Sequence, residues 1–198
     1  METLENKVRK AIRLVPDFPQ PGVMYKDITT FFRQPALLRD VIDDAVRRLA
    51  GFRPQALAAV ESRGFLLAVP IALQLGIPLV MLRKKGKLPL ETLSESYELE
   101  YGSATLEMHR DELSRGMRVA ITDDVLATGG TADAAARLIR KAGAEAVAAW
   151  FLVDLTHLGG RARLQESGLP VLATLVEAHE NCTDLGIDSL SERSTRWG

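Results

Sequence analysis

Short apolar runs alternate with helical segments over much of this 198-residue chain. We predict buried strands at residues 56–60, 79–82, 119–121, 146–153 and 171–176. Helical segments are predicted between them at residues 65–75, 131–142 and 158–166. A chain in which strands alternate with helices forms a mainly parallel sheet covered by helices on both faces. The sequence therefore predicts a doubly wound α/β fold.

Two further helices are predicted before this alternating region. Apolar residues recur at helical spacing from residue 4 to residue 12, which predicts a short amphipathic helix that Pro16 ends. Residues 35–50 carry apolar side chains at steps of three or four and are followed by Gly51, which is typical of a helix with a glycine at its C-terminus.

The chain length limits the number of domains. We expect a single domain over residues 1–198, because this length suffices for one well-buried core and is short for two. Within it we distinguish a small N-terminal hood region (1–34), a core (35–177) and a C-terminal tail (178–198) to which we assign no function. The polar segment 83–111 interrupts the alternation. We predict that it is a mobile flap, because long loops in compact domains are usually functional or disordered.

Charge and cysteine content exclude several classes of protein. The 25 basic and 26 acidic residues nearly cancel, so no overall field favours nucleic acid or an anionic membrane as a partner. Cys182 is the only cysteine, which rules out an intrachain disulfide and fits a cytoplasmic location. No segment approaches the roughly 20 apolar residues that a membrane-spanning helix needs. Any phosphate site must therefore be built from local groups.

The segment VAITDDVLATGGT, residues 119–131, joins a predicted strand to a predicted helix. Gly129 and Gly130 permit unusual dihedrals and a close approach of the backbone to a ligand. Thr128 and Thr131 supply hydroxyl groups, and Ala127 is a further small residue of the loop. The N–H groups and the dipole at the start of a helix favour an anion. The loop can therefore hold a phosphate without a lysine.

Two acidic residues, Asp123 and Asp124, precede this loop. Carboxylates would repel a phosphate that they touched, and two of them about 4 Å apart repel each other by roughly 4 kcal/mol at an intermediate effective dielectric. They therefore need a diol, a cation, or a nearby arginine or lysine. A ribose with vicinal hydroxyls, a 5-phosphate and a Mg²⁺-bound pyrophosphate would meet all of these demands.

Residues 119–131 resemble, over the whole motif, the 5-phosphoribosyl-1-pyrophosphate motif of type I phosphoribosyltransferases. The resemblance implies that Asp123 and Asp124 bind the ribose and that residues 127–131 bind the 5-phosphate. It implies Mg²⁺ as the cofactor, held through the pyrophosphate and the ribose hydroxyls, with no metal ligand assigned among the side chains. It also implies a homodimer.

A second candidate anion site, ESRG at residues 61–64, follows the predicted strand 56–60 and precedes a helix. Its backbone amides and Arg63 can converge on an anion. In the family this turn holds the pyrophosphate, which implies binding roles for Glu61, Ser62 and Arg63, and a catalytic role for Arg63 at the leaving group. Further positive charge can come from the start of the flap, at Arg83, Lys84, Lys85 and Lys87. The alternative for these four residues is a solvated basic loop.

The flap contains ELEYG at residues 98–102, which resembles the hood loop of adenine phosphoribosyltransferases. The resemblance implies that Glu100 faces the purine and that Tyr101 helps to close the site, so both are candidate catalytic residues. A carboxylate at the imidazole edge of adenine could manage the proton as the ring nitrogen bonds to the ribose. An ordinary exposed acid at position 100 is the alternative.

The segment DFPQPGVMYKDIT, residues 17–29, combines prolines, a glycine turn and an aromatic residue, as a rigid recognition loop does. It resembles the adenine-specific segment of the same family. The resemblance implies that Met24 contacts the base edge through its backbone, that Tyr25 stacks on the ring, and that Lys26 holds the loop. Many relatives have arginine at the position of Lys26, and lysine cannot form a bidentate pair. A purely structural loop is the alternative.

The four motifs occur in the family's order between about residues 16 and 176. They imply transfer of the phosphoribosyl group from 5-phosphoribosyl-1-pyrophosphate to adenine, a reaction of purine salvage that yields AMP and pyrophosphate. The alternatives are another purine acceptor (hypoxanthine, guanine or xanthine) and a regulator that binds the donor without catalysis. The regulator is disfavoured, because the balanced charge provides no nucleic-acid footprint and we expect too little chain before the core for a DNA-binding domain.

Overall fold

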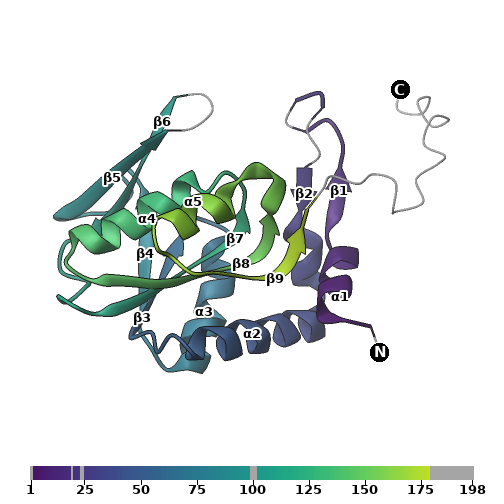
Figure 1. Ribbon diagram of the computed structural model, residues 1–198, viewed down its shortest axis with the longest axis horizontal. Helices are drawn as coiled ribbons and strands as arrows, with labels where there is room; N and C mark the ends of the chain where they lie inside the picture. Colours follow the sequence, from purple (N-terminus) through teal and green to yellow (C-terminus); the bar gives the residue numbers. More distant parts are fainter. Residues whose placement is uncertain (1, 19, 23–24, 99–101, 179–198) are drawn as a thin grey trace.

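The computed structural model describes residues 2–18, 20–22, 25–98 and 102–178. Seven strands form one sheet in the order β5-β6-β4-β3-β7-β8-β9 (Figure 1). The parallel strands are β3 (Ala56–Val60), β4 (Leu79–Lys84), β7 (Arg118–Leu126), β8 (Glu145–Leu155) and β9 (Val171–Glu177). The antiparallel strands are β5 (Thr92–Glu98) and β6 (Ser103–His109). The prediction of a mainly parallel sheet is confirmed.

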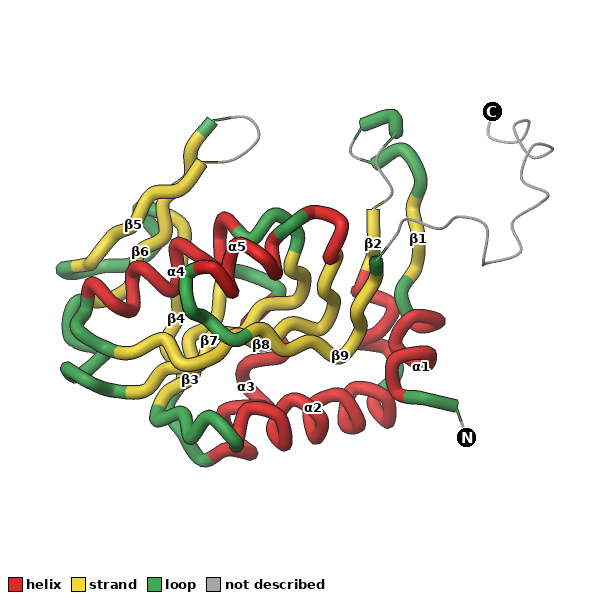
Figure 2. Tube along the Cα trace, in the orientation of Figure 1, coloured by secondary structure: helices red, strands yellow, loops and turns green. Residues whose placement is uncertain are grey.

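Helices cover both faces of this sheet (Figure 2). They are α1 (Leu4–Ala11), α2 (Pro35–Ala50), α3 (Gly64–Leu75), α4 (Gly130–Lys141) and α5 (Gly160–Glu166), with short 3-10 turns η1 (Ile28–Arg33) and η2 (Thr156–Leu158). Strand β3 shows how one strand serves both layers. Its residues 56, 58 and 60 pack in the cluster that contains α4 and α5, whereas residues 57 and 59 pack with α2 and α3. Every residue of β3 is buried, as a strand covered on both faces must be.

The N-terminal helix is shorter than predicted. It ends at Ala11 rather than near Pro16, and the next residues form strand β1 (Arg13–Val15), which pairs antiparallel with β2 (Tyr25–Asp27). The helical spacing of apolar residues is local, whereas the strand is stabilised by hydrogen bonds to a segment across a loop. Tertiary pairing therefore overrides the helical pattern at this point.

The flap is more regular than the predicted loop. Its strands β5 and β6 form an antiparallel hairpin, and β6 pairs with the end of β4 at Arg83 and Lys84, so the hairpin extends the main sheet. The flap sequence also predicts weak strand-like pieces near residues 97–101 and 105–109, and the second of these lies within β6. Of the first, residues 97 and 98 lie in β5, and residues 99–101 lie outside the described residues. The mobility of the flap stays a prediction.

A search of the described helices finds none that combines the length and the apolar character needed to cross a membrane.

The β1–β2 pair is held by Asp27, which accepts hydrogen bonds from Thr29 and Arg13. These bonds, that from Thr29 first, lower the pKa of Asp27 from 3.8 to about 2. A carboxyl group with a lower pKa in the folded chain stabilises the fold when it is ionised. This contribution is present above about pH 4 and is lost as the pH falls to about 2.

We therefore predict that Asp27→Asn lowers the free energy of unfolding relative to the native chain at pH 6, and that this difference shrinks as the pH falls from about 4 to about 2. Urea unfolding across this pH range measures it. Asp40→Asn is the matched control, because Asp40 forms only an exposed ion pair with Lys7. A difference that does not change with pH would contradict the assigned role of Asp27.

Candidate functional site

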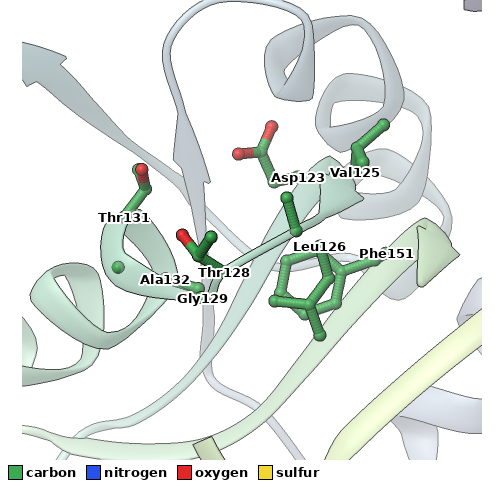
Figure 3. A pocket seen from close by; sticks show the side chains of 10 residues that line it. Asp123, Val125, Leu126, Thr128, Gly129, Thr131, Ala132 and Phe151 are labelled. Atoms are coloured by element: carbon green, nitrogen blue, oxygen red, sulfur yellow. The ribbon is translucent and has the colours of Figure 1, made fainter. Parts of the chain in front are cut away.

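A cavity lies at the carboxyl end of β7, where this strand passes into α4 (Figure 3). It is lined by residues 123 and 125–132 together with Phe151 of the neighbouring strand β8. Figure 3 shows the Asp123 carboxylate on the strand side and the Thr128 and Thr131 hydroxyls on the loop and helix side. Ligands of open α/β sheets bind at the carboxyl ends of strands, so the location agrees with the predicted phosphate loop.

The loop enters α4 through a left-handed glycine. Gly129 is the N-cap of α4 and has a φ of 78°, a conformation that favours glycine. The N-cap residue makes no side-chain hydrogen bond to the first N–H groups of α4. Residues 130–132, which carry these groups, line the cavity. Such N–H groups, together with the helix dipole, form an anion site.

The glycines at the start of α5 support this loop from behind. The Gly160 N–H donates to the Ala127 carbonyl oxygen at 3.0 Å. A Cβ atom at Gly160 would lie 2.2 Å from that oxygen and 2.8 Å from the Gly129 nitrogen. A Cβ atom at Gly129 would in turn lie 2.9 Å from the Gly160 Cα atom. The backbone of the phosphate loop therefore packs directly on the backbone of α5.

Of the two adjacent acidic residues of β7, Asp123 lines the cavity and Asp124 does not. Asp124 is buried, and its N–H donates to the Asp123 Oδ1 atom at 2.8 Å. Burial, and then the charge of Asp124, raise the pKa of Asp123 well above its ordinary value. The sequence predicted that such a pair needs a diol, a cation, or a nearby arginine or lysine, and the structure places Arg63 there: its Nε atom lies 2.6 Å from the Asp124 Oδ2 atom.

Arg63 connects the acidic pair to the base-binding segment. Its Nη1 atom donates to the Tyr25 hydroxyl at 2.7 Å, while its Nε atom forms the ion pair with Asp124. Burial opposes the charged guanidinium, but Asp124 and Tyr25 outweigh this effect, so the pKa of Arg63 is raised. The turn that carries Arg63 also lies against the acids, because a Cβ atom at Gly64 would lie 2.8 Å from the Asp123 Oδ1 atom.

Glu61 contacts three basic residues at the start of the flap. Its carboxylate forms an ion pair with Lys87, accepts a hydrogen bond from the Lys84 N–H at 3.0 Å, and lies 3.4 Å from the Arg83 Nε atom. The hydrogen bond from Lys87 is the main cause of the lowered pKa of Glu61. The structure thus brings together Glu61, Arg83 and Lys87, whereas Ser62 and the Lys84 side chain are exposed.

The base-binding segment is fixed at Tyr25 and Lys26. The Tyr25 ring packs edge to face on Phe18, with 5.0 Å between ring centroids. Lys26 forms an ion pair with Glu177 at the end of β9, which ties β2 to the main sheet. Met24, Glu100 and Tyr101 lie outside the described residues.

Residues 27–170 match the sequence model of the phosphoribosyl transferase domain family. The chain belongs to the phosphoribosyltransferase family. Among its relatives, the adenine phosphoribosyltransferase of Marinobacter nauticus is 48% identical over 171 residues, which is 86% of this chain and 95% of the relative.

Solved structures of phosphoribosyltransferases have the same fold. The adenine phosphoribosyltransferase of Thermoanaerobacter pseudethanolicus has a TM-score of 0.84 and 42% identity, covering 88% of this chain and all of that one. That of Saccharomyces cerevisiae, solved with adenine and an imino-altritol bisphosphate, has a TM-score of 0.82 and 35% identity, covering 87% and 98% of the two chains.

Sequence reasoning missed three residues that shape this phosphoribosyltransferase site. Gly160 sits behind the phosphate loop, Glu177 pairs with Lys26, and Phe18 packs on Tyr25. Only Gly160 left a signal in the sequence: a glycine pair, 159 and 160, stands where the predicted strand 146–153 gives way to a helix. The other two contacts join segments that are distant in the chain.

We predict that Gly160→Ala weakens donor binding by about tenfold or more, because the added Cβ atom must displace Ala127 and Gly129, and tenfold corresponds to about 1.4 kcal/mol. Isothermal titration calorimetry with 5-phosphoribosyl-1-pyrophosphate and Mg²⁺ measures the affinity. Gly51→Ala is the matched control: its φ is −60°, and the nearest atom to its Cβ is 3.8 Å away. Equal affinities in the two variants would contradict the supporting role of Gly160.

Proposed function

We propose that the protein transfers the 5-phosphoribosyl group from 5-phosphoribosyl-1-pyrophosphate to adenine, giving AMP and pyrophosphate. One observation carries this proposal: two adjacent acidic residues, the half-buried Asp123 and the buried Asp124, suit hydroxyl groups and lie beside a helix N-terminus, which suits a phosphate. A phosphorylated sugar presents both kinds of group. Adenine is proposed as the acceptor because the relatives that share almost half of this sequence are named for it.

In the proposed complex, the 5-phosphate binds the N–H groups and hydroxyls of residues 127–131, and Asp123 and Asp124 accept hydrogen bonds from the ribose hydroxyls. The pyrophosphate lies on the turn 61–64, within reach of Arg63, Arg83, Lys84 and Lys87. Pyrophosphate leaves an anomeric carbon, so the transition state resembles an oxocarbenium ion. Positioning and charge stabilisation then supply the catalysis without a nucleophilic side chain.

The residues of the site fit Mg²⁺ that arrives with the donor. In the described part of the chain, no group of three or more histidine, cysteine, aspartate or glutamate side chains could hold a metal by itself. Mg²⁺ usually keeps several waters and binds through one or two carboxylates plus substrate phosphates. Asp123 and Asp124 can supply such carboxylate oxygens. When bound, Mg²⁺ would neutralise charge on the departing pyrophosphate.

The proposal also assigns roles in adenine binding and catalysis to residues 24–26, 100 and 101. Tyr25 stacks on adenine, Met24 contacts its edge, and Lys26 holds the segment that carries them. Glu100 manages the proton of the base, and Tyr101 helps to exclude water that would hydrolyse the donor. The homodimer and the cytoplasmic location stay predictions.

The test incubates the protein with Mg²⁺, the donor and one base at a time, and follows nucleotide formation by chromatography. We expect AMP from adenine and much slower reaction with hypoxanthine, guanine or xanthine. A preference for another purine would replace the acceptor. Tight donor binding without any nucleotide product would favour the regulator instead.

We predict that Glu100→Ala lowers kcat by roughly 100-fold or more, the usual contribution of a general acid or base, and changes donor affinity much less. Steady-state kinetics and donor titration separate the two effects. Glu98→Ala is the matched control, since Glu98 is an exposed acid of the same hairpin. Unchanged turnover in Glu100→Ala would remove the assigned role of this residue.

We also predict that donor binding lowers the pKa of Asp123. Burial raises this pKa by opposing the charged form, whereas ribose hydroxyls that donate to the carboxylate stabilise the charged form. Carbon-13 NMR of the Asp123 carboxyl, assigned with Asp123→Asn, measures the pKa with and without donor and Mg²⁺. An identical pKa in both titrations would place the ribose away from Asp123.

A further inference from the structure

The first strand of the flap hairpin, β5, is docked on helix α4. Arg137 of α4 lies with its Nε atom 2.9 Å from the Glu95 Oε1 atom, and its Nη2 atom donates to the Ser96 carbonyl oxygen at 3.2 Å. One turn further along the helix, the Lys141 amine donates to the Ser94 carbonyl oxygen at 2.8 Å. Two side chains of α4 therefore hold three consecutive residues of β5.

Arg137 is also part of a longer chain of ion pairs. It pairs with Asp133, one turn back on α4, and the buried Asp133 carboxylate accepts a hydrogen bond from the Arg163 Nη2 atom of α5 at 3.1 Å. Helix α5 begins at Gly160, which packs on Ala127 of the phosphate loop. The ion pairs thus join the hairpin, α4 and α5 around the proposed phosphate site.

The pair between Glu95 and Arg137 differs from the ion pair at the open end of the hairpin. The Glu95 and Arg137 side chains are 23% and 36% exposed, whereas Glu91 and Arg110, which pair at the open end of the hairpin, are 83% and 62% exposed. Burial opposes the charge of Arg137, but Glu95 and Asp133 outweigh this and raise its pKa. Exposed ion pairs contribute little to stability. The partly buried pair of Glu95 and Arg137, with two hydrogen bonds to the β5 backbone beside it, fixes the position of β5 on α4.

The docked strand leads directly to the proposed catalytic residues. Strand β5 ends at Glu98, just before Glu100 and Tyr101. Its end already touches the phosphate site, because a Cβ atom at Gly130 would lie 3.4 Å from the Glu98 carbonyl oxygen and 3.5 Å from the Tyr97 Cδ2 atom. A small displacement of β5 along α4 would therefore move the atoms of Tyr97 and Glu98 that lie against Gly130.

We propose that Arg137 is a positioning residue: through Glu95 it sets the β5–β6 hairpin against the helix that binds the 5-phosphate in the proposed function, so that filling the phosphate site and holding the end of β5 at Tyr97 and Glu98 are coupled. This inference rests on the proposed function for its kinetic consequence. Its structural consequence, coupling between donor binding and the hairpin, can be measured without turnover.

The kinetic test uses Arg137→Gln and Glu95→Gln in the full chain. We expect kcat to fall by roughly 10- to 100-fold, as misplacement of a catalytic group by about 1 Å does, with a smaller change in the KM for the donor. Arg137→Lys, which keeps the charge, should recover part of the loss. The combined loss in the double variant should be smaller than the product of the two single losses, because both changes remove the Glu95–Arg137 pair. Glu91→Gln and Arg110→Gln are the matched controls and should keep the native kcat.

The structural test is hydrogen exchange with and without donor and Mg²⁺. In the native chain we expect donor to slow amide exchange in residues 92–98 as well as in 127–133. In Glu95→Gln the protection of 127–133 should persist while that of 92–98 is lost. If the native chain shows both protections but makes no AMP, the proposed function fails and the coupling stands.

The proposal is overturned if both variants keep native kcat, or if Glu95→Gln shows the native protection of 92–98. Thermal unfolding checks that each variant folds. Should Arg137→Gln not fold, Glu95→Gln decides the question, because Glu95 lies on the hairpin and its loss leaves the ion pairs of Arg137 with Asp133 and of Asp133 with Arg163 in place.

Discussion

Two adjacent carboxylates at the end of β7, the half-buried Asp123 and the buried Asp124, are the constraint on which the rest of the site depends. Asp124 is 5% exposed, and a charge in that position needs an opposite charge or hydrogen-bond donors. Arg63 supplies the opposite charge, and it can do so because Gly64 lets the turn after β3 approach Asp123 closely. The two anion-binding motifs, far apart in the sequence, are thus joined by electrostatic compensation.

The proposed phosphate loop follows the opposite principle, since it carries no charged side chain between residues 125 and 131 and offers an anion its backbone N–H groups and hydroxyls. A backbone site requires that the chain be placed accurately and that nothing fill the space where the anion sits. Small residues meet both needs here: Gly129 adopts the left-handed turn, and Gly160 allows α5 to contact the loop through backbone atoms alone. Accurate placement therefore comes from packing behind the loop rather than from groups within it.

The features that the sequence predicted are those in which local pattern and tertiary packing agree. The predicted bounds of β3 and α2 match the structure. The continuous apolar run of β3 suits a strand buried on both faces, and the amphipathic repeat of α2, which starts at a proline, suits a helix that covers the sheet. Strand β1 was not predicted, because its three residues acquire their conformation only by pairing with β2. The contacts of Lys26 with Glu177 and of Arg137 with Glu95 were likewise not predictable, since each depends on where the fold brings two polar residues that have no common motif.

Pairing of charges also reconciles a nearly neutral chain with sites for a strongly anionic donor. With 25 basic and 26 acidic residues, the molecule has no excess positive field, and two of the basic side chains near the site have an acidic partner: Arg63 has Asp124, and Lys87 has Glu61. Under the proposed function, a donor phosphate that reaches these cations exchanges one anionic partner for another instead of meeting an unpaired charge. Before the donor binds, the acidic partners hold these cations in place. Once the donor has bound, the carboxylates lie next to the ribose hydroxyls and Mg²⁺, which can take the place of the cations. Under the proposed function, the acid–base pairs Arg63–Asp124 and Lys87–Glu61 would therefore exchange their partners together when the donor binds.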